Sequence, residues 1–172
     1  MTAAPDGAAA RLFKAVVGPT ENASSVVYGI ITVGAVLAAE GSRNESFQRS
    51  VGAAILILLL YWVVHAWSVD SGDRLARRRP FRWPDFLAEL RAEFSIMRGA
   101  VLPIAAVVIA GLAGATDQRA VFIGTLVSAA MLVVFEFSVA MLGRLGAKQV
   151  LVQTAAGALF GCALIVLRFV IV

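Results

Sequence analysis

Two ionisable side chains lie in long apolar stretches of the sequence, where a charge is costly. His65 follows an apolar run that begins at Ala53, and Glu136 lies between two phenylalanines. Ionisable groups inside a bilayer cost roughly 2.5–3.5 kcal/mol on insertion scales, and they usually face the protein interior and serve a function. A histidine near a carboxylate is a common proton-relay pair, because the charge state of each group depends on the other. The sequence therefore predicts a proton-titratable site in the membrane.

The expected depths of His65 and Glu136 in the membrane agree. If both apolar stretches run from outside to inside, each residue lies about 7–8 Å past the centre of its helix, toward the cytoplasm. Tyr28, Gln153 and Thr154 reach the same layer from two other stretches and complete a hypothetical ion or proton pathway. The alternative is structural. His65 would then reach a headgroup or a loop carbonyl, and Glu136 would pair with a hydroxyl or a loop arginine.

Motifs of enzymes and metal sites are missing from the sequence. It contains one histidine and one cysteine, Cys162, which exclude a multi-histidine or cysteine-rich metal site. Neither the GxSxG turn of hydrolases nor the GxxxxGK[ST] loop of nucleotide-binding proteins occurs. We therefore expect that the protein is not an enzyme and that it uses no metal or cofactor.

The composition indicates a membrane protein. Of the 172 residues, 60% are hydrophobic and 15% are charged, against about 45–50% and about 25% in soluble domains. The apolar residues gather in stretches of about 20, the length that spans a bilayer. We predict an all-α polytopic helical bundle with about five transmembrane helices and one amphipathic helix on its cytoplasmic side. Abundant alanine and arginine indicate a bacterial protein of the cell (inner) membrane.

The predicted organisation is a cytoplasmic N-terminal segment, residues 1–23, and a single transmembrane domain, residues 24–172. The expected spans are residues 24–40, 51–69, 99–115, 120–142 and 149–171. Small residues repeat at four-residue spacing in two of these spans, and such repeats predict close helix packing. They are Gly157 with Gly161, and Ala106 with Ala110 and Gly114.

The distribution of positive residues predicts the orientation. With a cytoplasmic N-terminus, eleven of the 15 lysines and arginines fall on the inside and four on the outside. Positive residues are favoured on the cytoplasmic side of a membrane. The C-terminus is then extracytoplasmic, and the net charge of +4 reflects orientation and not nucleic-acid binding.

The long cytoplasmic loop, residues 70–98, holds seven arginines and the predicted amphipathic helix. Pro84 suits the first turn of this helix, and apolar residues recur at helical spacing as far as Met97. We expect the helix to lie on the membrane surface. Four arginines form a hypothetical site for anionic lipid headgroups: Arg77, Arg78, Arg79 and Arg82. The alternative is that these charges serve orientation alone.

Two classes of function are compatible with these features. The first is a small channel or transporter subunit with a proton-titratable site within the membrane. Five short spans enclose little interior, so a pore would require a homo-oligomer or a partner membrane protein. The second is a non-transporting accessory or scaffold protein that contacts lipid or a partner membrane protein. A polar crevice at Glu136 and His65 would favour the first class, and a dry, packed interior would favour the second.

Overall fold

The computed structural model describes residues 23–41 and 45–170, and within these ranges the chain is helical with no strands. This confirms the predicted all-α class. The predicted cytoplasmic segment lies almost wholly outside the described residues. The helices are α2 (Ala23–Glu40), α3 (Phe47–Arg77), α4 (Trp83–Ala92), α5 (Ser95–Leu112), α6 (Asp117–Leu142) and α7 (Ala147–Val170).

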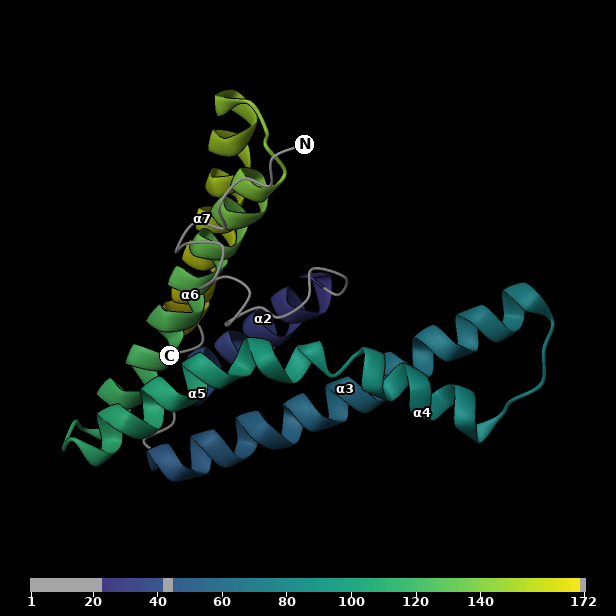
Figure 1. The fold of residues 1–172 in the computed structure, drawn as a ribbon. Helices are drawn as coiled ribbons and strands as arrows, with labels where there is room; N and C mark the ends of the chain where they lie inside the picture. The colour runs from purple at the N-terminus through teal and green to yellow at the C-terminus, as the bar shows by residue number, and fades with distance from the viewer. Residues whose placement is uncertain (1–22, 42–44, 171–172) are drawn as a thin grey trace, which may run out of the picture.

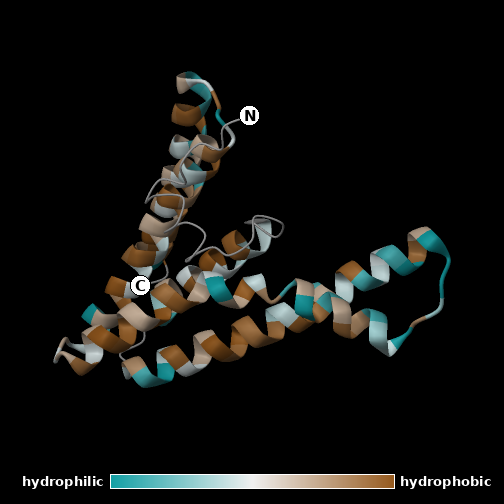
Figure 2. Ribbon diagram, viewed as in Figure 1, coloured by the Kyte–Doolittle hydropathy of each residue, from teal (hydrophilic) through white to brown (hydrophobic). Residues whose placement is uncertain are grey.

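Four of these helices, α3, α5, α6 and α7, are long and apolar enough to cross a membrane. The apolar part of α2, Ser24–Glu40, is shorter than these four. Each of the five predicted spans coincides with one helix, although five crossings remain a prediction. Hydrophobic residues dominate the helices, whereas hydrophilic residues gather at the far end of the hairpin that α3 forms with α4 (Figure 2).

The helices form two hairpins that diverge from a common end (Figure 1). One hairpin consists of α3 and the successive helices α4 and α5, and the other consists of α6 and α7. Helix α2 lies between the hairpins and packs on both. Its buried residues Val33 and Leu37 join one core with α3, α5 and the start of α6, while Val26 and Ile30 join a second core with α6 and α7.

Polar contacts close the common end. The Arg168 guanidinium donates to the carbonyl of Gly41 at 3.5 Å and to that of Gln118 at 3.2 Å. It also stacks over the Phe122 ring, with 5.0 Å between Cζ and the ring centroid. These contacts tie the end of α7 to the end of α2 and the start of α6.

Glycines let the helix backbones touch. A Cβ atom at Gly29 would collide with the carbonyl oxygen of Ile96, and one at Gly99 would collide with that of Val26. Helices α2 and α5 therefore cross backbone to backbone.

The small-residue repeat in α7 packs in the same way. A Cβ atom at Gly157 would lie 2.7 Å from the carbonyl oxygen of Leu132, and one at Gly161 would lie 2.9 Å from that of Ala129. This confirms the predicted packing role of Gly157 and Gly161. Gly114 differs, because it follows the end of α5 in open space with φ +87° and so serves a turn.

Helix α3 continues through residues 70–77, which the hydropathy pattern assigned to a loop. Two ion pairs at helical spacing stabilise this extension: Asp70 with Arg74 and Asp73 with Arg77, both at 2.8 Å. At 1.5 Å per residue the 31 residues of α3 measure about 46 Å. The hydrocarbon core of a bilayer is about 30 Å thick, so α3 is long enough to extend well beyond it.

The predicted amphipathic helix from Pro84 to Met97 is divided into two helices. Helix α4 ends at Ala92, and α5 begins at Ser95, several residues before the predicted span. Helix α4 packs along α3, since Phe86 is buried and contacts the Trp67 ring at 5.6 Å between centroids. A neighbouring helix therefore covers part of the apolar face that the sequence assigned to lipid.

Candidate functional site

His65 is paired with Glu93. Its Nε2 atom lies 3.5 Å from Oε2 of Glu93, and the two side chains are only 26% and 13% exposed. The hydroxyl of Ser25 donates a hydrogen bond of 2.6 Å to the same carboxylate oxygen. Three helical segments therefore meet at one carboxylate: the start of α2, the middle of α3 and the break between α4 and α5.

The break between α4 and α5 places Glu93 at this position. Ala92 is the last residue of α4, and the N–H groups of Glu93 and Phe94 complete its final turn. Trp62 on α3 fixes both sides of the break. Its Nε1–H donates to the carbonyl of Leu90 at 3.0 Å, and its ring meets that of Phe94 edge-on at 5.8 Å.

Two tyrosines flank the imidazole. The Tyr61 ring is stacked on the His65 ring with 5.7 Å between centroids and an angle of 18° between planes. The Tyr28 ring lies 5.6 Å from His65 and 6.3 Å from Tyr61, both tilted. The two tyrosine rings restrict the motion of the imidazole. Because Tyr28 is exposed at the edge of the bundle, the cluster is close to the molecular surface.

The chemistry available to this cluster is proton exchange. Neutral imidazole at 3.5 Å from an oxygen makes no strong hydrogen bond, because such bonds measure about 2.7–3.2 Å. Protonation turns the contact into an ion pair, while deprotonation leaves Glu93 with the Ser25 hydroxyl. Within the described ranges, no group of three His, Cys, Asp or Glu side chains could hold a metal ion.

The other predicted pathway residues lie on the second hairpin. Glu136 on α6 is half-buried, and its side chain packs on Gly157 of α7. Gln153 has a buried side-chain oxygen without a hydrogen bond, and the Thr154 hydroxyl donates to the carbonyl of Val150 in its own helix.

The hypothetical pathway is therefore divided in two. Tyr28 and His65 belong to the Glu93 cluster, while Glu136, Gln153 and Thr154 belong to the α6–α7 hairpin. Among the described residues, the structure records no contact between His65 and Glu136.

Three members of the cluster were absent from the sequence-based site: Ser25, Tyr61 and Glu93. Glu93 lies within the amphipathic helix predicted from Pro84 to Met97, and no proline or glycine near it predicts a break. Tyr61 offered a clearer signal, because it lies four residues before His65, on the same helical face. Ser25 carried no signal beyond being polar near the start of a span.

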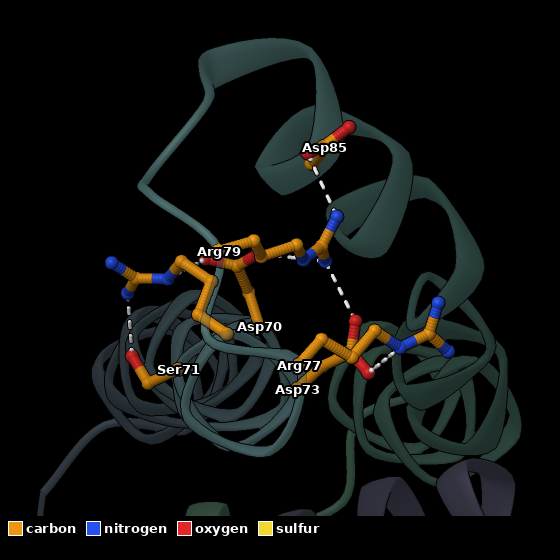
Figure 3. A network of polar contacts seen from close by, with 7 residues as sticks. Asp70, Ser71, Asp73, Arg77, Arg79 and Asp85 are labelled. Carbon is orange, nitrogen blue, oxygen red and sulfur yellow. Dashed lines mark hydrogen bonds and ion pairs between the residues drawn. The ribbon is translucent and has the colours of Figure 1, made fainter.

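A second polar network joins α3 to α4 at the far end of their hairpin (Figure 3). Arg79 contacts Asp85 at 2.8 Å, Asp73 at 2.7 Å and Asp70 at 3.7 Å. The Asp70 side chain is 1% exposed, and its partners Arg74 and Arg79 hold it by charge attraction without a well-directed hydrogen bond. We call this unit, residues 70–92, the hairpin head.

The four arginines of the predicted lipid site fall into two groups. Arg77 and Arg79 are engaged by aspartates in the network. Arg78 and Arg82 are exposed, and neither has an ion pair within the described part of the chain. Only the second pair has its charge uncompensated in the structure.

Comparison with known proteins adds no relative. No family model, no curated protein and no solved structure matches this chain.

Proposed function

We propose that this chain is a multi-pass membrane protein that works as a small proton-linked channel or transporter subunit. The observation that carries the proposal is the shared carboxylate oxygen of Glu93, which faces the His65 imidazole and accepts from Ser25. This pair lies where a span meets the arginine-rich hairpin head, the region expected to face the cytoplasm by its positive charge. A proton arriving from that side would reach His65 past the exposed Tyr28.

Conformational coupling follows from the position of Glu93. It lies in the break between α4 and α5, so a change in its pairing with His65 acts directly on the junction of two helices. Small changes at such junctions are a common source of larger helix rearrangements. In this proposal, loss of the imidazole proton weakens the contact between α3 and the break, and the α3–α5 hairpin changes its packing on α2.

Proton flux into liposomes tests the proposal. Purified protein is reconstituted with an internal pH-sensitive dye, and flux is measured after a pH jump in wild type, Glu93→Gln and Glu136→Gln. We expect flux in wild type, a loss of at least tenfold in Glu93→Gln, and little change in Glu136→Gln. Glu45→Gln at the opposite end serves as the matched control, because within the described residues that half-buried carboxylate pairs with the exposed Arg49 on its own helix end and with no other group. Flux that survives Glu93→Gln would remove the pair from the mechanism.

A second candidate is a non-transporting accessory or scaffold protein, alone or with a partner membrane protein. It is supported by the hydroxyls of Thr125, Ser128 and Thr154, which donate to carbonyls of their own helices. Hydroxyls bonded in this way contribute to packing and offer no line of groups for an ion. Absence of proton and cation flux in the wild-type protein would favour this candidate.

A further inference from the structure

The far end of the hairpin head combines free positive charge with exposed apolar side chains. The head contains six arginines and four acidic residues. The aspartates are engaged with Arg74, Arg77 and Arg79. Arg78 and Arg82 border the short connection between α3 and α4, and both are exposed. Their charge is therefore available to a ligand.

Apolar surface adjoins these two arginines. Leu75, whose carbonyl accepts from the Arg78 N–H, is 82% exposed, and Trp83, which follows Arg82, is 66% exposed. Tryptophan is enriched at headgroup depth in membranes. Phosphate groups above acyl chains match both halves of this surface.

The interior of the head holds it rigid. The Trp67 and Phe81 rings contact each other, and the guanidinium of Arg74 lies over both, with its Cζ 5.2 and 5.0 Å from the two centroids. The Trp83 ring meets the Phe81 ring edge-on at 5.2 Å. These contacts hold Trp83 in place beside Arg82, so binding would have to order the two arginine side chains but little of the backbone.

The angle between the two hairpins is compatible with a tip that lies near the lipid surface. The two hairpins diverge (Figure 1), so they cannot both stand along the membrane normal. When α6 and α7 stand upright, the α3–α5 hairpin is inclined, and an inclined hairpin carries its tip closer to the lipid surface than an upright one.

We infer that the tip of the hairpin head, through Arg78, Arg82 and Trp83, binds the phosphate headgroups of anionic phospholipids. The inference is independent of the proton chemistry at Glu93. It distinguishes Arg78 and Arg82 as ligands from Arg77 and Arg79, which maintain the fold of the head.

Native mass spectrometry of the detergent-solubilised protein tests this inference. Phosphatidylglycerol or phosphatidylcholine is titrated, and bound lipid is counted. We expect preference for phosphatidylglycerol, with affinity about fivefold lower for each arginine removed in Arg78→Gly and Arg82→Gln. The matched control is Arg144→Gly. Arg144 also follows a helix with φ 51°, as Arg78 does, so the two variants share backbone effect and charge change.

Three outcomes decide between binding and general electrostatics. Weaker phosphatidylglycerol binding by Arg78→Gly and Arg82→Gln, together with unchanged binding by Arg144→Gly, supports the inference. Equal binding of both lipids by wild type overturns it, and so does an equal loss in Arg144→Gly. Circular dichroism melting checks that Arg78→Gly is folded, which we expect because glycine readily adopts a positive φ.

Discussion

Ser25 and His65 contact the same oxygen of Glu93, at 2.6 Å and 3.5 Å respectively. The hydroxyl can donate whatever the state of the imidazole, whereas the imidazole pairs strongly only when it is protonated. The carboxylate therefore has one partner that donates in either state of the imidazole and one whose pairing depends on the imidazole charge. This asymmetry lets the group stay hydrogen-bonded in a region of low dielectric while its second contact changes.

Removal of the Asp70 charge should loosen the hairpin head. Asp70→Asn leaves Arg74 and Arg79 without their buried partner. We expect the free energy of unfolding to fall by about 2–3 kcal/mol. This is less than for a fully buried pair, because both arginines are partly exposed. Asp73→Asn, at a more exposed position, should cost under about 1 kcal/mol. Thermal unfolding in detergent and hydrogen exchange of α4 measure both. Equal effects of the two variants would contradict the assigned burial.

The crossing of α2 and α5 should not tolerate a methyl group. Gly99→Ala places a Cβ against the backbone carbonyl of Val26, which cannot rotate away. We expect the free energy of unfolding to fall by about 1–3 kcal/mol, the usual range for overpacking. Gly52→Ala is the control, because that helical glycine has open space around it and should gain about 0.5–1 kcal/mol. A neutral Gly99→Ala, by melting temperature, would refute the backbone contact.

Glu89 should make stability depend on pH. Burial, and then repulsion from Glu93, Asp70 and Asp73, raises the pKa of Glu89 above its ordinary value. The folded state therefore favours the protonated carboxyl, and stability falls as pH rises through the ordinary value and then the raised one. Glu89→Gln should be more stable than wild type at pH 7, with the difference vanishing in acid below the ordinary value. Melting temperatures across this pH range provide the measurement, and a gain that persists in acid would exclude this cause.

Glycine should relieve two strained helix ends. Arg78 and Arg144 both have φ 51°, a left-handed conformation that costs a residue with a Cβ about 1–2 kcal/mol. Arg78→Gly and Arg144→Gly should each raise stability by about 1 kcal/mol, less the entropy that glycine loses on folding. Thermal unfolding of both variants checks this. A decrease in either would mean that the arginine side chain stabilises that helix end more than the strain costs.

Hydropathy placed the helices of this chain well. Long apolar stretches gave the positions of α5, α6 and α7 to within a few residues, and the glycines of α7 gave its contact with α6. The end of α3 was also readable in principle. Asp70 with Arg74, and Asp73 with Arg77, stand at the spacing of helical ion pairs. Hydropathy alone assigns such charged residues to a loop.

The candidate site was less predictable because its pairing depends on tertiary contacts. Two tertiary hydrogen bonds hold the break at Glu93: the Trp62 indole donates to the Leu90 carbonyl, and the Ser25 hydroxyl donates to the Glu93 carboxylate. No residue type near the break predicts it from the sequence. Equal depth made Glu136 a reasonable partner for His65, but depth does not specify which helices are neighbours. Helix α2 lies between the two hairpins, and this arrangement has no signature in a single sequence.

Nuclear magnetic resonance of the single histidine tests the His65–Glu93 pair most directly. Protein labelled with ¹⁵N-histidine gives ring signals that need no assignment, since His65 is the only histidine. A contact between His65 and Glu93 predicts that Glu93→Gln displaces these signals strongly at neutral pH and that Glu136→Gln leaves them in place. Ring signals that respond to Glu136→Gln and ignore Glu93→Gln would contradict it.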